Sequence, residues 1–260
     1  PAMIADALDR LRQDWSAAAW WDALRAEFGE PEMLDAARPR PHRPGRVRAV
    51  GPRLVAHVFA GNVPSVAVTS LVRALLVKAA SFGKTASGEP LTAVAFARAL
   101  ADVDPELGAC VAVTYWPGGD TAREAALFEV ADTVIAYGTD ATIADLHARV
   151  PWRTTFRAYP HRIGVALVSR EALHGDGART LAERAALDVA TFDQQGCVAP
   201  HSIYVEGDAD AAAEFAAALG QALEALERRW PRRRLDAAEA RAIHEARACV
   251  EIRGGRVWAP

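Results

Sequence analysis

The chain has 260 residues, of which 51% are hydrophobic and 24% charged, and its formal net charge is -3 at pH 7. This length allows one large domain or two small ones, each with a buried core. The charge excludes the basic surface of a general nucleic-acid-binding protein, and no run approaches the roughly 18 consecutive apolar residues of a membrane span. The 3 cysteines form neither a disulfide framework nor a zinc-binding spacing, which favours a reducing cytoplasm.

The first 46 residues predict a helix followed by a linker. Apolar residues recur at helical spacing between about residues 3 and 28, with Leu8, Leu11 and Trp15 on one side. Residues 38–46 are rich in proline and arginine. Because proline removes a backbone donor and biases the residue before it to extended conformations, we expect no regular structure in this linker.

From residue 53 onward, a strand, a glycine-containing turn and a helix follow one another repeatedly. Apolar segments predict strands at 54–59, 79–84, 109–114 and 133–137. The helices that follow them are predicted at 65–76, from Pro90 onward, at 121–130 and up to about Pro151. Strands that alternate with helices form a mostly parallel sheet, whose ligand crevice lies at the carboxyl ends of the strands. We therefore predict one α/β domain over residues 47–152.

A second, smaller α/β lobe is predicted over residues 153–260. Its strands are expected at 163–168 and 202–205, and its helices at 178–191 and 210–230. A basic cluster, residues 228–234, ends the last of these helices. We interpret it as complementing the helix dipole, with Pro231 stopping the helix, in preference to a site for CoA phosphates or nucleic acid.

Cys197 is the strongest candidate for a catalytic residue. It lies between a predicted helix and a predicted strand, after Gly196, which lets the backbone approach a ligand, and before Pro200, which fixes the chain. Cys110 lies in an apolar run and is expected to be a small buried residue, whereas Cys249 is uninformative.

The standard nucleotide and hydrolase signatures are absent from the sequence. It has no GxGxxG, Walker or G-x-S-x-G motif, so any cofactor site must be atypical. Residue types alone allow a thioester hydrolase in which Cys197 is paired with His161 or His201 as base. Nothing in the spacing identifies either histidine as that base.

Three segments together resemble one known family. They are residues 57–64 (HVFAGNVP), residues 84–90 (KTASGEP) and residues 193–197 (DQQGC) with Pro200 and His201. Their order and spacing resemble the LuxC-type acyl-CoA reductases, a branch of the aldehyde dehydrogenase superfamily, over about residues 50–207. The resemblance implies an α/β, aldehyde-dehydrogenase-like fold, with a mostly parallel sheet in a nucleotide-binding lobe and a partial α/β catalytic lobe.

The resemblance also implies a two-step reduction of an acyl thioester to an aldehyde. Cys197 matches the nucleophile, whose thiolate attacks the thioester and releases CoA before NADPH delivers hydride to the acyl-enzyme. Asn62 matches the side-chain amide that binds the oxyanion together with the Cys197 backbone N–H, although Asn62 also suits a plain turn. The expected partners are an acyl-CoA or acyl-carrier thioester, with a homo-oligomer or an acyl-transfer protein as further candidates.

On the cofactor side the resemblance implies four residues. Lys84 matches a lysine that contacts the adenosine ribose, and Ser87 stands where NAD-preferring relatives carry a glutamate. A glutamate there would repel a 2′-phosphate, so a serine next to Lys84 favours NADPH. Gly138 and Thr139 match the turn that opens the helix under the pyrophosphate. A solvated strand end for Lys84 and an ordinary turn for Gly138 are the alternative interpretations.

The sequence departs from the superfamily in two ways. Residues 158–162 read AYPHR where aldehyde-oxidising relatives carry a general-base glutamate, and its absence disfavours attack by water on the acyl-enzyme. A further acidic ribose contact and the later strands of the superfamily are not found before Pro260, so we expect a fragment of a longer protein. The alternative function is therefore a catalytically incomplete nucleotide-fold fragment or a partner-binding subunit.

Overall fold

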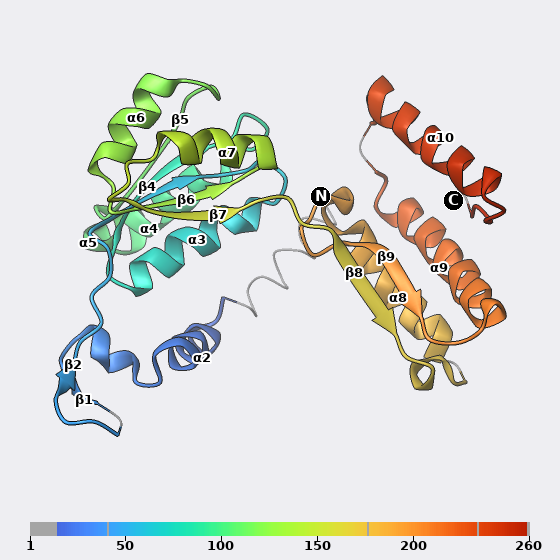
Figure 1. The fold of residues 1–260 in the computed structure, drawn as a ribbon, viewed down its shortest axis with the longest axis horizontal. Coiled ribbons are helices and arrows are strands. Elements are labelled where there is room, and N and C mark those ends of the chain that lie inside the picture. Colours follow the sequence, from blue (N-terminus) through green and yellow to red (C-terminus); the bar gives the residue numbers. More distant parts are fainter. Residues whose placement is uncertain (1–14, 41, 176, 233, 259–260) are drawn as a thin grey trace. The chain divides into compact units, whose positions relative to one another are not determined.

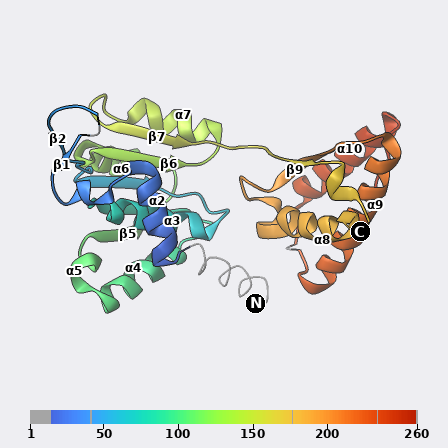
Figure 2. The ribbon, with the colours of Figure 1, turned by 90° about the horizontal axis from the view of Figure 1, so that it is seen from below.

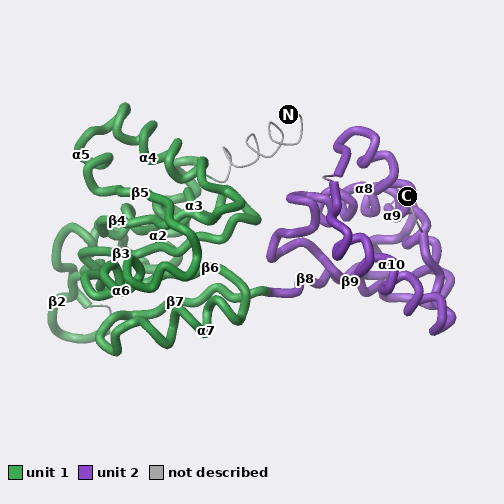
Figure 3. The backbone as a smooth tube through the Cα atoms, turned by 90° about the horizontal axis from the view of Figure 1, so that it is seen from above, with its two compact units in different colours: residues 1–161 green, residues 162–260 purple. Residues whose placement is uncertain are grey.

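The computed structural model describes residues 15–40, 42–175, 177–232 and 234–258 (Figure 1). The chain divides into two compact units, residues 1–161 and residues 162–260 (Figure 3). Within the described ranges, no helix combines the length and apolar character that crossing a membrane requires.

A five-stranded parallel sheet forms the centre of the first unit. Its strands are β3 (Leu54–Val58), β4 (Ala80–Thr85), β5 (Val111–Tyr115), β6 (Thr133–Tyr137) and β7 (Thr155–Tyr159). They lie in the order β5-β4-β3-β6-β7, and every neighbouring pair is parallel. The predicted strands are confirmed in β3 to β6. Because all the strands are parallel, their carboxyl ends lie along one edge of the sheet.

Helices cover both faces of this sheet (Figure 1). On one face lie α3 (Pro64–Leu76) and α4 (Thr92–Val103), and on the other α6 (Thr121–Val130) and α7 (Asp140–Arg149). Successive residues of β3 point to opposite faces: Val55 packs with Ala74 of α3, and Ala56 packs with Phe128 of α6. Burial on both faces explains the continuous apolar runs in the sequence.

The helix predicted from Pro90 begins two residues later than expected. The Glu89 carboxylate accepts hydrogen bonds from Leu91 N–H at 3.2 Å, Thr92 N–H at 2.9 Å and the Thr92 hydroxyl at 2.8 Å. These bonds satisfy donors at the start of α4, which begins at Thr92. A short helix that we do not predict, α5 (Pro105–Gly108), follows α4 and packs against it (Figure 2).

Strand β7 is not predicted by the sequence pattern. Its register pairs Thr155 with Thr133 and Tyr159 with Tyr137, which makes it an edge strand of the first sheet. Four of its five residues are exposed, so it lacks the apolar run that marks the buried strands. The compact units accordingly divide after residue 161, whereas the predicted boundary follows residue 152.

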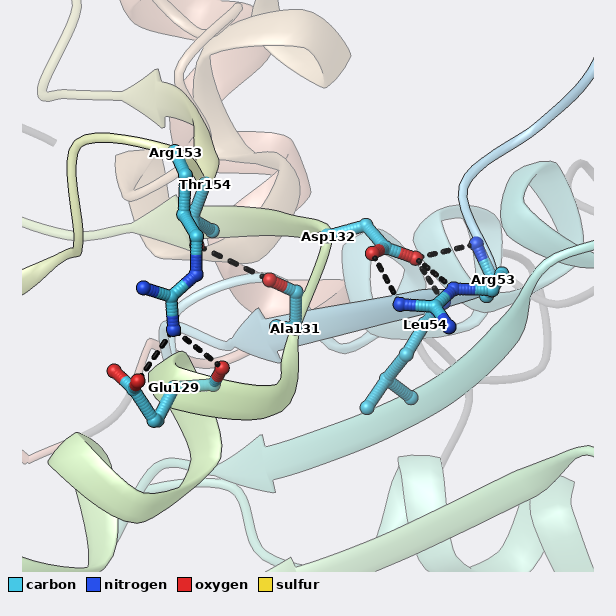
Figure 4. Close-up of polar contacts among 7 residues, drawn as sticks. All are labelled: Arg53, Leu54, Glu129, Ala131, Asp132, Arg153 and Thr154. Carbon is cyan, nitrogen blue, oxygen red and sulfur yellow. Dashed lines mark hydrogen bonds and ion pairs between the residues drawn. The ribbon is translucent and has the colours of Figure 1, made fainter.

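Polar side chains join the strands at their amino-terminal edge (Figure 4). The Asp132 carboxylate accepts from the backbone N–H of Arg53 at 2.7 Å and of Leu54 at 3.2 Å, and it pairs with the Arg53 guanidinium. The Arg53 side chain, followed by these backbone bonds, lowers the pKa of Asp132. The end of α6 is joined to the start of β7 by the pairs Ala131–Thr154 and Glu129–Arg153. These contacts fix the edge of the sheet opposite the predicted site.

The N-terminal segment contains more structure than predicted. Helix α2 (Ala17–Phe28) confirms part of the predicted helix, while residues 3–14 lie outside the described residues. A 3-10 turn, η1 (Pro31–Leu34), then buries both of its end residues. The expectation that residues 38–46 lack regular structure is wrong, because β1 (Arg38–Pro39) pairs antiparallel with β2 (Arg46–Val47). A proline is tolerated in such a ladder because an edge strand leaves some N–H groups without a partner strand.

The second unit is built on a two-stranded parallel sheet of β8 (Gly164–Val168) and β9 (Pro200–Val205). Helices α8 (Gly177–Ala190) and α9 (Ala209–Arg229) pack on it and bury Val168, Ala182 and Phe215. The remaining elements are η2 (Glu171–Leu173), η3 (Thr191–Gln194) and α10 (Ala237–Ile252). The predicted strands and helices of this lobe are therefore confirmed.

The end of α9 agrees with our interpretation of the basic cluster. Arg228 and Arg229 lie in the last turn of the helix, where cations complement the dipole. Arg228 also pairs with Glu224 at 2.8 Å, and the Arg229 guanidinium lies 5.2 Å from the centre of the Trp230 ring. Residue 233 of the cluster lies outside the described residues.

Candidate active site

The cofactor-side residues predicted from the sequence lie along one edge of the first sheet. Asn62 follows β3, and Gly138 and Thr139 follow β6. Lys84 is the second-last residue of β4, and Ser87 lies just beyond the end of that strand. Since β4, β3 and β6 are adjacent parallel strands, these positions share the carboxyl edge. This edge is where open α/β sheets bind ligands.

Asn62 lies in an exposed turn, and its backbone conformation does not explain why this residue is an asparagine. Its φ is not positive, so the turn does not require the left-handed tolerance for which asparagine is often selected. The turn after β4 comes close to Gly61, where an added Cβ would lie 3.2 Å from Ala86 Cβ and 3.2 Å from Glu89 N. The turn after β3 therefore packs directly on the turn after β4.

Lys84 is buried at the carboxyl end of β4, with 7% of its surface exposed. It stands in register with Val58 of β3 and Thr114 of β5, so both neighbouring strands enclose it. Among the described residues no carboxylate forms an ion pair with this side chain. A buried cation without an acidic partner is unusual, and it is not the solvated strand end that was our alternative interpretation.

Ser87 forms a hydrogen bond that the sequence analysis does not anticipate. Its hydroxyl lies 3.1 Å from the Tyr115 hydroxyl, at the end of β5. Ser87 is exposed, and Tyr115 keeps 47% of its surface accessible. The next residue, Trp116, is buried against α6 and holds this end of β5 in place. The strand register is the feature that would have identified Tyr115, because it pairs Tyr115 with Thr85 of β4.

Gly138 and Thr139 form the turn into α7. Thr139 is the N-cap of this helix, and its hydroxyl accepts from Thr142 N–H at 3.3 Å. An added Cβ at Gly138 would lie 3.2 Å from the Thr142 side chain, so a residue other than glycine would crowd the first turn. The first backbone N–H groups of a helix attract anions, although the Asp140 carboxylate in the same turn opposes one.

A buried polar network lies beneath this edge. His57 in β3 is fully buried; its Nδ1 lies 2.9 Å from the Ser70 hydroxyl and its Nε2 lies 3.2 Å from the Ser81 hydroxyl. The Tyr137 hydroxyl donates to Ser70 at 3.1 Å, and the Tyr137 ring stacks on Tyr159 at 4.8 Å. The network connects α3, which follows Asn62, with the strand that precedes Gly138.

Burial gives the unit a pH-dependent stability. Burial lowers the pKa of His57 from 6.5 to about 4. Between these pH values His57 is protonated in the unfolded chain but not in the folded one. The free energy of unfolding therefore falls as the pH falls from about 6.5 to 4, by roughly 3 kcal/mol in all. Denaturant unfolding of the parent and of His57→Gln should show the difference between them shrinking as the pH falls. If the free energies of unfolding of the two proteins changed in parallel with pH, this explanation would be contradicted. The matched control is His244→Gln, at an exposed histidine of α10.

Cys197 lies at an exposed turn of the second unit, between η3 and β9. Ala199 N–H donates to the Gly196 carbonyl at 3.0 Å, which closes the turn around Cys197. The Gln194 side-chain amide donates to the Pro200 carbonyl at 3.5 Å, a long bond across the base of the loop. The thiol therefore stands at the tip of a loop whose two ends are held together.

The chain just before this loop has an unusual backbone. Phe192, Asp193 and Gln194 all have positive φ, between 55° and 60°. Each non-glycine residue in this region costs about 1–3 kcal/mol, and such strain persists only where the surrounding structure imposes it. Here Gln195 N–H donates to the Phe192 carbonyl at 3.0 Å. The strain lies directly beside the candidate nucleophile, where it sets the direction in which the loop leaves α8.

The other predicted candidates are placed as follows. His201 Nδ1 lies 3.1 Å from the Ala199 carbonyl, so Nδ1 donates and, in the neutral ring, Nε2 carries the lone pair. His161 is the last residue of the first unit. Cys110 is exposed, which corrects the expectation that it is buried, because it lies in the turn before β5. In the described part of the chain, no group of three or more His, Cys, Asp or Glu side chains is placed to hold a metal ion.

Two solved structures that share this arrangement of elements are aldehyde dehydrogenases. An NAD-dependent benzaldehyde dehydrogenase from Corynebacterium glutamicum matches with a TM-score of 0.59 and 19% identity, over 73% of this chain and 41% of that one. The aldehyde dehydrogenase KauB from Pseudomonas aeruginosa matches with a TM-score of 0.57 and 20% identity, over 79% and 40%. The fold is therefore aldehyde-dehydrogenase-like, as predicted.

Sequence comparison identifies the family within this class. The acyl-CoA reductase (LuxC) family matches residues 1–255, and the chain belongs to it. A long-chain acyl-protein thioester reductase from Aliivibrio fischeri is 30% identical over 217 residues, 78% of this chain and 43% of that protein. One from Photobacterium leiognathi is 29% identical over 208 residues, 76% and 42%. The chain thus spans less than half the length of these curated relatives.

Proposed function

We propose that the protein reduces an acyl thioester, carried by CoA or by a protein, to an aldehyde, with NADPH as hydride donor and Cys197 as covalent acyl carrier. Membership of the acyl-CoA reductase family supports the reaction class. The names of the relatives, which are long-chain acyl-protein thioester reductases, support a protein-bound acyl group as one donor. In this proposal the first unit holds the coenzyme and the second carries the nucleophile.

One observation supports the proposal more than any other: the carboxyl edge of the first sheet gathers the groups that a dinucleotide needs. The edge offers a buried lysine with no acidic partner in the described chain, two neutral hydroxyls at Ser87 and Tyr115, and a glycine turn at a helix N-terminus. These groups fit the ribose and phosphates of an NADP-type coenzyme. When bound, the coenzyme would supply a hydride.

Cys197 acts twice in this proposal. Its thiolate attacks the thioester carbonyl, the carbon–sulfur bond to the donor breaks, and the donor leaves as a thiol after taking a proton. Once the acyl carbon has received hydride, its bond to the Cys197 sulfur breaks, which releases the aldehyde and restores the thiolate. The overall reaction consumes a thioester, NADPH and a proton, and yields an aldehyde, a thiol and NADP⁺.

The end of β7 supports reduction in preference to hydrolysis. Residues 158–162 contain no glutamate, and strand β7 ends among them at Tyr159. In the aldehyde-oxidising relatives that the sequence resembles, a glutamate in this segment activates water for attack on the acyl-enzyme. The absence of that glutamate disfavours hydrolysis, so we expect the acyl group to remain on sulfur until hydride arrives.

The full chain with tetradecanoyl-CoA and NADPH tests this function. We expect loss of NADPH absorbance, with equal amounts of aldehyde and free thiol formed. The same assay with the acyl group on a carrier protein identifies the preferred donor. Without NADPH, thiol release should stop at one equivalent per chain, because the acyl group then remains on Cys197. Continuous thiol release without NADPH would contradict the proposal and would indicate a thioester hydrolase.

A further inference from the structure

The Ser87 and Tyr115 hydroxyls form a pair at the carboxyl edge of the first sheet, where we propose that the coenzyme binds. They are 3.1 Å apart and come from the ends of adjacent parallel strands, β4 and β5. Both residues remain accessible to solvent. Two neutral hydroxyls can turn their hydrogens outward together, so the pair can donate two bonds to one anionic group.

The charge around this pair favours an anion. Lys84 lies three residues before Ser87 and has no acidic partner among the described residues. Glu89 is the nearest acidic residue along this turn, and its Oε1 atom accepts three hydrogen bonds from Leu91 and Thr92 at the start of α4. The carboxylate is therefore engaged in capping α4. Bonds from neutral donors to a charged group are stronger than bonds between neutral groups.

We propose that Ser87 and Tyr115 together recognise the 2′-phosphate of the adenosine ribose, which makes Tyr115 a specificity-determining residue for NADP(H). This inference rests on the proposed function, because it assumes that the coenzyme binds at the carboxyl edge. It adds a residue that the motif comparison does not include. The burial of Trp116 presets the position of Tyr115, so little ordering is needed when the phosphate binds.

Adenosine fragments test this inference without any catalytic step. Titration calorimetry on the full chain compares 2′,5′-ADP, which carries the 2′-phosphate, with 5′-AMP, which lacks it. We expect the parent to bind 2′,5′-ADP at least tenfold more tightly. Tyr115→Phe should weaken 2′,5′-ADP about tenfold and change 5′-AMP less than twofold, because the lost bond involves a charged group.

Two further variants sharpen the test. Ser87→Ala should resemble Tyr115→Phe, and the double variant should lose less than the product of the two single losses, because the hydroxyls act as a pair. Tyr204→Phe is the matched control, since Tyr204 is a 62% exposed tyrosine of β9 in the second unit. It should bind both fragments as the parent does.

The outcomes separate this inference from the proposed function. If the parent binds 2′,5′-ADP and 5′-AMP equally, or if Tyr115→Phe weakens both fragments alike, the hydroxyl pair does not read the 2′-phosphate, while nucleotide binding stands. If the parent binds neither fragment, the proposed function itself fails, and this inference fails with it.

Discussion

Replacing Cys197 with serine is expected to lower the rate of acyl-thioester reduction by about 10³-fold or more. A serine hydroxyl is barely ionised at neutral pH, whereas a thiol is partly ionised and its thiolate is a strong nucleophile. Since Cys197 is exposed, the substitution should change the free energy of unfolding by less than about 0.5 kcal/mol. Steady-state NADPH oxidation measures the loss, and denaturant unfolding checks the stability.

The chain supplies its own controls for this substitution. Cys110 and Cys249 are also free and exposed, so Cys110→Ser and Cys249→Ser make the same chemical change at other sites. Both variants should retain the parent rate. Reduction by Cys197→Ser at the parent rate would show that Cys197 does not carry the acyl chain.

Replacing Asn62 with alanine is expected to lower kcat by about 10²–10³-fold, the usual effect of losing one oxyanion donor. In the proposed reaction the Asn62 amide donates to the carbonyl oxygen on which negative charge develops, and alanine removes this donor. Because the φ of Asn62 is not positive, alanine can adopt the same backbone conformation. The loss should therefore appear in kcat, with the dissociation constant for 2′,5′-ADP unchanged within about twofold. Single-turnover reduction measures it directly.

Asn62→Asp is the sharper comparison, because its carboxylate has nearly the shape of the amide but repels an oxyanion. We expect it to be slower than Asn62→Ala. If instead Asn62→Ala keeps the parent kcat and only lowers the melting temperature, Asn62 is a turn residue, the interpretation that its sequence context also allows.

The fold could be predicted where the sequence carries a strong periodic signal. Strands β3 to β6 are buried on both faces, so they appear as apolar runs between glycine turns. Strand β7 was not predicted because it is an exposed edge strand, in which Thr155 and Arg157 interrupt the apolar run. Cys110 was misjudged because its apolar run begins in a turn and becomes a strand only at Val111. Apolar runs therefore indicate burial on average, without fixing where an element starts.

In the candidate site, too, some features can be predicted from residue types and others depend on the three-dimensional structure. Motifs located Cys197 and the residues at the carboxyl edge of the sheet. Residue types do not predict the left-handed run from Phe192 to Gln194, because such conformations favour glycine, asparagine or aspartate and only Asp193 is one of these. The Ser87–Tyr115 bond depends on the register between β4 and β5, which no local pattern encodes. Contacts between distant segments required the structure.

The central claim is that Cys197 carries the acyl group, and intact-protein mass spectrometry tests it most directly. The full chain is incubated with tetradecanoyl-CoA in the absence of NADPH, and the modified residue is then identified by peptide mapping. The account predicts a mass increase of one tetradecanoyl group, located on Cys197, that disappears as aldehyde forms when NADPH is added. An unmodified Cys197, or an acyl group on Cys110 or Cys249 that is likewise consumed by NADPH, would contradict it.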